Sequence, residues 1–331
     1  MIDIHSHFFP PLSFEQAQNI DKDWPWLDQH SEERGFIMQG RERFRPARAP
    51  LWNAASRLEE LDNHGIDTQV ICATPILFGY DRQPEVASAA AVMINDLALS
   101  YCRENPVRLK CLCQVPLQSL KHACDELDRA MASGHIGVQI GNHVAARDMD
   151  DGELLEFLQH CAATDAPVLV HPWDMMGRER MDRYMLQWLV AMPAETQLSI
   201  LYLILSGAFE RLPTKLRICF AHGGGSFAYL LGRVDNAWKH RDIVSENCPN
   251  VPSSYCDRFY TDSILFEPSA LSLLIETMGE QRVLFGTDYP FPLGEQKPGE
   301  TINNHPTMSA ACRHRLLSEN AIEFFGEKLG R

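Results

Sequence analysis

The feature that most constrains the fold is a repeated alternation of short apolar runs with helical patterns. Eight such runs occur along the 331 residues, and each is nearly continuous in apolar side chains, as is typical of strands buried on both faces. We expect strands at residues 2–7, 68–73, 109–115, 137–141, 167–171, 216–222, 258–262 and 282–288. The pattern predicts an α/β protein, a closed (β/α)8 TIM barrel wrapped by helices, and a single domain over residues 1–331.

One long interruption of this alternation follows the first strand. Residues 11 to about 50 are polar, aromatic and irregular, and they show no helical period. Loops of this length are uncommon in compact domains and usually cover or bind something, so we expect this insertion to form part of an active-site cover. Four arginines fall in its last residues, at 41, 43, 45 and 48. They fit either a solvated charge run or an anion-binding segment.

Charge and cysteine usage narrow the possible partners and compartment. The formal net charge of −14 disfavours a nucleic-acid partner, because phosphate binding needs clustered Lys and Arg. The ten cysteines form no Cys-x-x-Cys pair and several lie in apolar runs, as free thiols do in a reducing compartment. The first expected strand begins at residue 2, which leaves no space for a secretory leader, and the longest apolar run, 198–209, is too short to cross a bilayer. We predict a cytoplasmic protein with no membrane partner.

Polar side chains occupy the carboxyl ends of several expected strands. His5 and His7 end the first strand and point to the same face, since side chains two apart on a strand do so. His171 ends the fifth strand, His222 the sixth and Asp288 the eighth. Each alone has an ordinary explanation, as a surface or structural histidine or as a turn-forming aspartate. Because the carboxyl ends of barrel strands converge on one mouth, all five together favour a functional site.

The chemistry of this set suits a metal ion. Three imidazoles from His5, His7 and His171 and one carboxylate from Asp288 fit Zn²⁺ or a similar divalent ion, with a position left for water. Because four ligands are then assigned, we interpret His222 as the general base, since an imidazole exchanges a proton near neutral pH.

Longer motifs carry a resemblance to a known family. They are Ile4-His5-Ser6-His7-Phe8-Phe9-Pro10, Phe44-Arg45-Pro46, His171-Pro172-Trp173-Asp174-Met175-Met176, His222-Gly223-Gly224-Gly225-Ser226-Phe227 and Gly286-Thr287-Asp288-Tyr289-Pro290-Phe291-Pro292. From residue 2 to about 326 the chain resembles the amidohydrolase superfamily and, within it, the family of aminocarboxymuconate-semialdehyde decarboxylases. The resemblance implies a zinc-dependent, non-oxidative decarboxylation. It implies one metal ion per chain, because residues 139–142 lack the lysine that bridges two metals in other members.

The same resemblance implies substrate contacts and an assembly. Arg45 matches a residue that binds a substrate carboxylate, and Arg233 matches one that reaches the site of the neighbouring subunit in a homodimer. Arg233 lies off the apolar stripe of its helix, although a solvated arginine would look the same. Pocket-wall positions of the family match Phe44, Met175, Trp188 and Phe291, each of which could equally be ordinary core.

Two other interpretations stay open from the residues alone. A metal-dependent hydrolase that cleaves a small dicarboxylate amide or lactone would begin with the same activated water. A barrel that holds a metal without turnover would need no spare base such as His222. The loop residues Cys248 and Cys256 have no predicted role.

Overall fold

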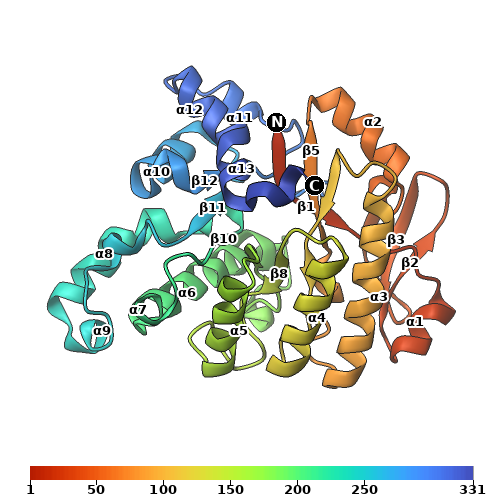
Figure 1. The fold of residues 1–331 in the computed structure, drawn as a ribbon, viewed down its shortest axis with the longest axis horizontal. Coiled ribbons are helices and arrows are strands. Elements are labelled where there is room, and N and C mark those ends of the chain that lie inside the picture. Colours follow the sequence, from red (N-terminus) through yellow and green to blue (C-terminus); the bar gives the residue numbers. More distant parts are fainter. Residues whose placement is uncertain (331) are drawn as a thin grey trace.

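Eight parallel strands surrounded by helices form the centre of the computed structural model, which describes residues 1–330 (Figure 1). Two of the segments, β6 and β7, are halves of the third strand. The segments are β1 (Ile2–Phe8), β5 (Thr68–Ala73), β6 (Leu109–Cys111), β7 (Cys113–Gln114), β8 (Val138–Gly141), β9 (Val168–His171), β10 (Ile218–Phe220), β11 (Tyr260–Asp262) and β12 (Val283–Leu284).

Hydrogen bonds continue around the whole barrel. β1 pairs with β5 and β5 with β6, while β7 to β12 form an unbroken parallel series. The third strand is interrupted only at Leu112, whose N–H donates to the Ile71 carbonyl at 3.0 Å. The circle closes between β12 and β1, where the Ile4 N–H donates to the Phe285 carbonyl at 2.9 Å. The predicted TIM barrel is therefore confirmed.

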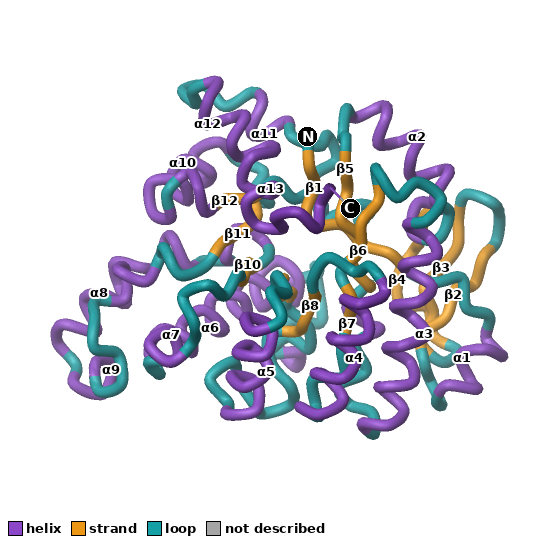
Figure 2. The backbone as a smooth tube through the Cα atoms, in the orientation of Figure 1, coloured by secondary structure: helices purple, strands orange, loops and turns teal. Residues whose placement is uncertain are grey.

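Helices cover the outside of the strands, as Figure 2 shows. Their apolar faces point inward: in α10, for example, Leu271, Leu274 and Met278 are buried at helical spacing. The helices of the barrel are α2 (Ala54–His64), α3 (Pro84–Cys102), α4 (Leu120–Ser133), α5 (Gly152–Ala163), α6 (Met192–Leu205), α7 (Ala208–Arg211), α8 (Phe227–His240), α9 (Asp242–Ser245), α10 (Pro268–Met278), α11 (Glu300–Asn303), α12 (Ala310–His314) and α13 (Asn320–Phe325).

Side chains fill the interior of the barrel and block its amino-terminal end. Ile4, Val70, Leu169 and Leu284, from four different strands, belong to one buried cluster. Phe324 of α13 joins this cluster and packs on Tyr260, at the amino end of β11. Reactive groups are thus confined to the opposite end, where the strands terminate.

The insertion after β1 is ordered, and the expectation of an irregular segment is wrong. It forms a helix, α1 (Phe14–Ile20), and an antiparallel sheet of β2 (Pro25–Gln29), β3 (Arg34–Gln39) and β4 (Glu42–Arg48). Ser13 starts α1 with a capping box completed by Gln16, a signal that the search for a helical period missed. Apolar residues of the sheet pack against α3, so the insertion has a small core of its own.

One helical stretch also differs from expectation. A π-helical turn, Gln187–Ala191, continues into α6, and together they span 19 residues, which by length and composition alone is enough to cross a membrane. The apolar run expected from the sequence, 198–209, is shorter because it begins after Glu195, which lies within this helix. Within the protein, 39% of this stretch is buried, and Ile200, Leu203 and Ile204 lie in the core. A core helix passes the same test of length and composition.

Candidate active site

A bulge in β1 aims two histidines at the barrel mouth. Compared with β5, β1 has one extra residue between Asp3 and Ser6. Ile4 can therefore stay in the barrel interior while His5 and His7 both face the mouth. Their Nε2 atoms lie 3.2 Å apart, and both side chains are buried, as the strand alternation predicted.

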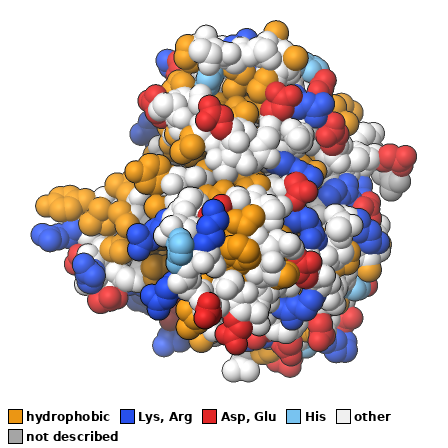
Figure 3. Space-filling model, turned by 90° about the vertical axis from the view of Figure 1, so that its left-hand side faces the viewer, with side chains coloured by type: hydrophobic (Ala, Val, Ile, Leu, Met, Phe, Trp, Pro, Cys, Tyr) orange, Lys and Arg blue, Asp and Glu red, His pale blue; other side chains and the backbone are white. Residues whose placement is uncertain are grey.

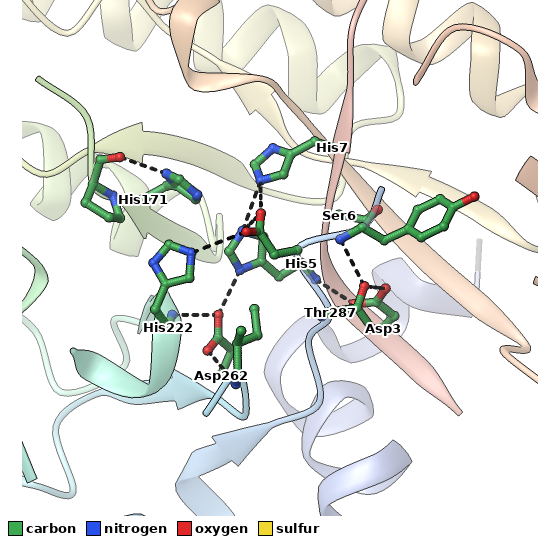
Figure 4. A network of polar contacts seen from close by, with 12 residues as sticks. Asp3, His5, Ser6, His7, His171, His222, Asp262 and Thr287 are labelled. Carbon is green, nitrogen blue, oxygen red and sulfur yellow. Dashed lines mark hydrogen bonds and ion pairs between the residues drawn. The ribbon is translucent and has the colours of Figure 1, made fainter. Parts of the chain in front are cut away.

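The four predicted metal ligands lie together at this mouth, and Figure 4 shows the three histidines among them. One donor atom from each of His5, His7, His171 and Asp288 lies within 4.8 Å of the others, and all four residues are buried. His7 Nε2 is 2.8 Å from Asp288 Oδ1, and His5 Nε2 is 3.7 Å from the same oxygen. Residues separated by more than 280 positions in the chain thus form one compact donor set.

Hydrogen bonds to two of these histidines leave nitrogen lone pairs that fit a cation. His5 Nδ1 lies 2.8 Å from Asp262 Oδ2, and His171 Nδ1 lies 3.0 Å from the Pro172 carbonyl. Because both oxygens only accept, each Nδ1 carries the proton and each Nε2 presents its lone pair to the cluster. His171 Nε2 is buried and has no hydrogen-bond partner among residues 1–330. The donor set fits a divalent cation such as Zn²⁺ or Mn²⁺.

The protonation states of three of these ligands also favour a metal. Burial, only partly opposed by Asp288, lowers the pKa of His7 to about 4. Burial and the neighbouring imidazoles hold the pKa of His171 well below its ordinary value. Burial raises the pKa of Asp288, but its close contacts with His222 and His7 outweigh this effect and hold it well below its usual range. At His5, burial lowers the pKa, but the hydrogen bond and charge of Asp262 raise it overall. Neutral imidazoles and an ionised carboxylate are the forms that bind metals.

His222 lies beside the donor set without belonging to it. Its ring centroid is 5.0 Å from that of His171, and its Nε2 is 3.8 Å from Asp288 Oδ2. Neither ring nitrogen has a hydrogen-bond partner within the described chain. The imidazole is therefore available to exchange a proton with a molecule bound at the mouth, as the predicted general base requires.

The backbone at His222 is held in an uncommon conformation. Its φ of +56° lies in the left-handed region, and Gly225, three residues later, has a φ of +64°. A Cβ on Gly225 would lie 2.0 Å from the Pro193 carbonyl oxygen, so only glycine fits there. The glycine run thus permits the tight turn that places His222 at the mouth.

Asp262 is a site residue that the sequence analysis did not select. Its fully buried carboxylate accepts hydrogen bonds from His5 Nδ1 and from the backbone N–H groups of His222 and Gly223, at 2.8, 2.9 and 2.8 Å. Burial raises its pKa, but the hydrogen bond and charge of His5, the charge of His222 and the Gly223 N–H together lower it overall. Asp262 ends the expected seventh strand, so the strand-end argument that selected Asp288 could have found it. It orients both a metal ligand and the candidate base.

Arg45 projects from β4 into an aromatic setting at the same mouth. Its guanidinium carbon lies 4.7 Å from the ring centroids of Phe44 and Phe291 and 5.8 Å from that of Trp188. Burial lowers the pKa of Arg45, and the charge of Asp288 opposes this change. A largely desolvated guanidinium among aromatic rings is well placed to bind a carboxylate.

The predicted wall residues surround this region. Phe44, Met175 and Trp188 line a cavity of about 280 Å³. Phe291 lies outside that lining, but its ring centroid is 5.0 Å from that of His7. A larger hollow of about 680 Å³ lies between α1 and the β3–β4 hairpin, and of the predicted wall residues only Phe44 lines it. The lining of neither cavity includes a metal-ligand candidate, but the smaller one contains three of the four wall residues, so we assign the substrate space to it.

Arg233 is the one predicted site residue that its own chain does not bring to the mouth. It is exposed on α8 and makes no hydrogen bond or ion pair with residues 1–330. Its predicted contact with a neighbouring subunit stays a prediction.

Comparisons with known proteins agree with this geometry. A family model described as amidohydrolase matches residues 2–326. The chain is 37% identical to the 2-amino-3-carboxymuconate-6-semialdehyde decarboxylase of Dictyostelium discoideum, over 98% of this chain and 91% of that protein. It is 28% identical to the Caenorhabditis elegans protein of the same name, over 97% and 93% of the two chains.

Solved structures confirm the fold. Metarhizium anisopliae IDCase in its apo form superimposes with a TM-score of 0.84 at 21% identity, over 100% of this chain and 97% of that chain. A dihydroxybenzoic acid decarboxylase from Polaromonas, solved with bound manganese and 2-nitroresorcinol, gives 0.78 at 24% identity, with the same coverage. The resemblance found in the motifs is confirmed: the chain belongs to the amidohydrolase family, among its metal-dependent decarboxylases.

Proposed function

We propose that the chain catalyses the non-oxidative decarboxylation of 2-amino-3-carboxymuconate 6-semialdehyde to 2-aminomuconate 6-semialdehyde, with one Zn²⁺ per chain. The observation that carries the proposal is a buried set of three histidines and one aspartate beside an unpartnered imidazole, in a chain 37% identical to a decarboxylase of that substrate. The proposed enzyme acts in tryptophan or nitroaromatic catabolism. A cytoplasmic location is part of the proposal, and it is supported by ten cysteines that are all free.

The residues at the mouth divide the work. A bound cation would supply Lewis acidity and a water that ionises at neutral pH. His222, whose ring nitrogens make no hydrogen bond within residues 1–330, accepts a proton from water and can return one to the carbon that loses its carboxylate. Loss of carbon dioxide leaves an electron pair on that carbon, and a proton must replace the departing group. Arg45 holds a carboxylate in place, and the aromatic rings around it limit the access of water.

A homodimer is also part of the proposal, because a substrate with two carboxylates needs a second cation. Arg233 is exposed on α8, four residues after Tyr229, which is 80% exposed. Figure 3 views this side of the molecule and shows apolar side chains gathered on it. Such a surface is typical of a protein contact. The exposed large apolar residues of the surrounding segments are Met176, Tyr184, Met185, Leu189, Val190, Tyr229, Ile243 and Phe266.

A decarboxylase assay on the zinc-loaded protein tests the proposal directly. The semialdehyde is supplied, its disappearance is followed by absorbance, and released carbon dioxide is trapped and measured. We expect one carbon dioxide per substrate consumed. Arg45→Met should raise KM by at least about tenfold through loss of a bidentate carboxylate contact. Arg43→Met is the matched control, because Arg43 lies on the same strand but stacks on Phe36 instead.

The alternative function predicts a different result when a dicarboxylate lactone or amide is supplied in parallel with the semialdehyde. A hydrolase would open the lactone or cleave the amide without releasing carbon dioxide. That outcome, with no turnover of the semialdehyde, would replace the proposed activity with metal-dependent hydrolysis.

A further inference from the structure

A fully buried arginine lies directly behind the metal-binding strand. Arg57 of α2 is 0% exposed, and its guanidinium lies on the opposite side of β1 from the histidine cluster. It donates to the backbone carbonyl of His7, to Ser6 Oγ at 3.1 Å and to Gln69 Oε1 at 2.7 Å. It also donates to the Pro50 carbonyl, at 2.8 and 3.0 Å. One side chain thus binds the metal-ligand residue His7, the residue before it in the same strand and the end of the insertion.

Arg57 forms no ion pair with a carboxylate of residues 1–330. Its acceptors are two backbone carbonyls, two hydroxyls and one amide, and its guanidinium carbon lies 5.2 Å from the ring centroid of Tyr289. A buried cation without a charged partner is costly unless its hydrogen bonds are well satisfied. The hydrogen bonds of Arg57 meet this condition.

A chain of hydrogen bonds continues from Arg57 to the second metal-binding segment. Gln69 Nε2 donates to Asp3 Oδ2 at 2.7 Å, and Asp3 Oδ2 accepts from Thr287 Oγ1 at 2.6 Å. The Thr287 backbone N–H also donates to Asp3, at 3.1 Å, immediately before the ligand Asp288. Figure 4 shows Asp3 and Thr287 next to each other, apart from the imidazole rings of His7, His171 and His222. The network therefore joins the strand that supplies His7 to the turn that supplies Asp288.

The network lies beside the irregular part of β1. β1 is bulged between Asp3 and Ser6, so pairing with β5 is interrupted at Ile4 and His5 and resumes at Ser6 and His7. Arg57 binds Ser6 and His7, the first two residues after the bulge, from the outside of the strand.

We propose that Arg57 is a positioning residue for the metal centre, which fixes the His7 carbonyl and, through Gln69 and Asp3, the turn before Asp288. Residues behind a metal site typically change metal affinity by about 10- to 100-fold when they are replaced. Arg57 acts on the geometry of the donor set, so its loss should increase the rate at which the metal leaves. This inference rests on the metal centre of the proposed function but is independent of its substrate.

The experiment measures zinc release without substrate. Zinc-loaded protein is mixed with excess chromogenic chelator, and the release rate is followed by absorbance. We expect Arg57→Met to release zinc about 10- to 100-fold faster than the unmodified protein. Arg57→Lys, which keeps the charge but loses the planar fork, should fall between the two.

A matched control separates positioning from general loss of stability. Arg258 also donates to two backbone carbonyls, those of Phe209 and Leu212, and stacks on an aromatic ring, but it precedes β11 at the opposite end of the barrel. Arg258→Met should lower the melting temperature without changing zinc release by more than about twofold. Equal release rates in folded Arg57→Met and Arg258→Met would overturn the proposal. If Arg57→Met does not fold, the zinc-release rates of Arg57→Lys and Gln69→Leu are compared with that of Arg258→Met instead. Unchanged release in both variants would also reject the positioning role of Arg57.

Discussion

Two side chains that lie 3.8 Å apart, His222 and Asp288, differ in what they bind. Asp288 contacts His7 at hydrogen-bond distance and is held ionised, whereas neither ring nitrogen of His222 makes a hydrogen bond within the described chain. One side chain is therefore suited to hold a cation and the other to move a proton. Because both have positive φ values, asparagine is a better replacement than alanine at either position.

Exchanging each of these residues for asparagine should separate metal binding from turnover. His222→Asn should keep one zinc per chain and lower kcat by about 10²- to 10⁴-fold, the usual contribution of a general base. Asp288→Asn removes the only carboxylate of the donor set and should lose zinc on dialysis. Metal analysis and steady-state kinetics on the same samples check both outcomes. Full activity in His222→Asn would remove its assignment as the base.

At this scale the sequence predicted the residues whose role depends on their position in a strand. His5 and His7 lie in β1, His171 ends β9 and Asp288 follows β12, so an approximate strand assignment was sufficient to group them. Arg57 was not predictable in this way, because its role depends on hydrogen bonds that cross from a helix to two strands. Nothing in a local pattern distinguishes it from an exposed helix arginine.

At the scale of elements, periodic patterns predicted the barrel but not the insertion. The barrel strands are continuous apolar runs because they are buried on both faces. In contrast, β2 to β4 are short and include Pro25 and Pro46, and a proline in a sequence argues against a strand. Both are tolerated in the structure, because Pro25 is the first residue of β2 and Pro46 lies in the edge strand β4.

The turn between α4 and β8 contains a buried histidine, His135, whose pKa is shifted by folding. His135 is 2% exposed, its Nδ1 lies 3.1 Å from the Ala130 carbonyl and its Nε2 has no partner in residues 1–330. Burial, partly opposed by the Ala130 bond, lowers the pKa of His135 from 6.5 to about 4. The unfolded chain binds a proton below pH 6.5, but the folded chain does so only near pH 4. Acid therefore favours unfolding, and stability falls as the pH drops through this window.

Replacing His135 should flatten the acid side of the stability profile. At pH 5 its buried neutral ring costs about 2 kcal/mol relative to pH 7.5, and His135→Leu should remove this difference. Denaturant unfolding of the zinc-loaded protein at both pH values gives the change, and the exposed His240→Gln serves as the control. An unchanged difference between the two pH values in His135→Leu would contradict the assignment.

At the scale of the whole molecule, a strongly acidic protein presents a local cationic site for an anionic substrate. The net charge is −14, yet Arg45 lies at the mouth among aromatic rings and the exposed Arg233 projects from α8 beside apolar surface. A single chain offers Arg45 but not Arg233 to its own mouth. A twofold dimer would exchange the same surface on both partners, so each α8 could complete the other subunit's site.

Mixing two inactive variants tests whether Arg233 acts across subunits. In a mixed dimer of Arg45→Ala and Arg233→Ala chains, the Arg233→Ala chain keeps its own Arg45 and receives Arg233 from its partner. Its site is complete, while the other site lacks both arginines. Random exchange makes half of the dimers mixed, so about one quarter of the unmodified activity should return. Mixing Arg45→Ala with His222→Asn is the matched control, because neither site is then complete and no activity should return. If mixed dimers form but no activity returns, Arg233 does not act in the active site of the neighbouring subunit. The apolar surface around α8 would then have no role in catalysis.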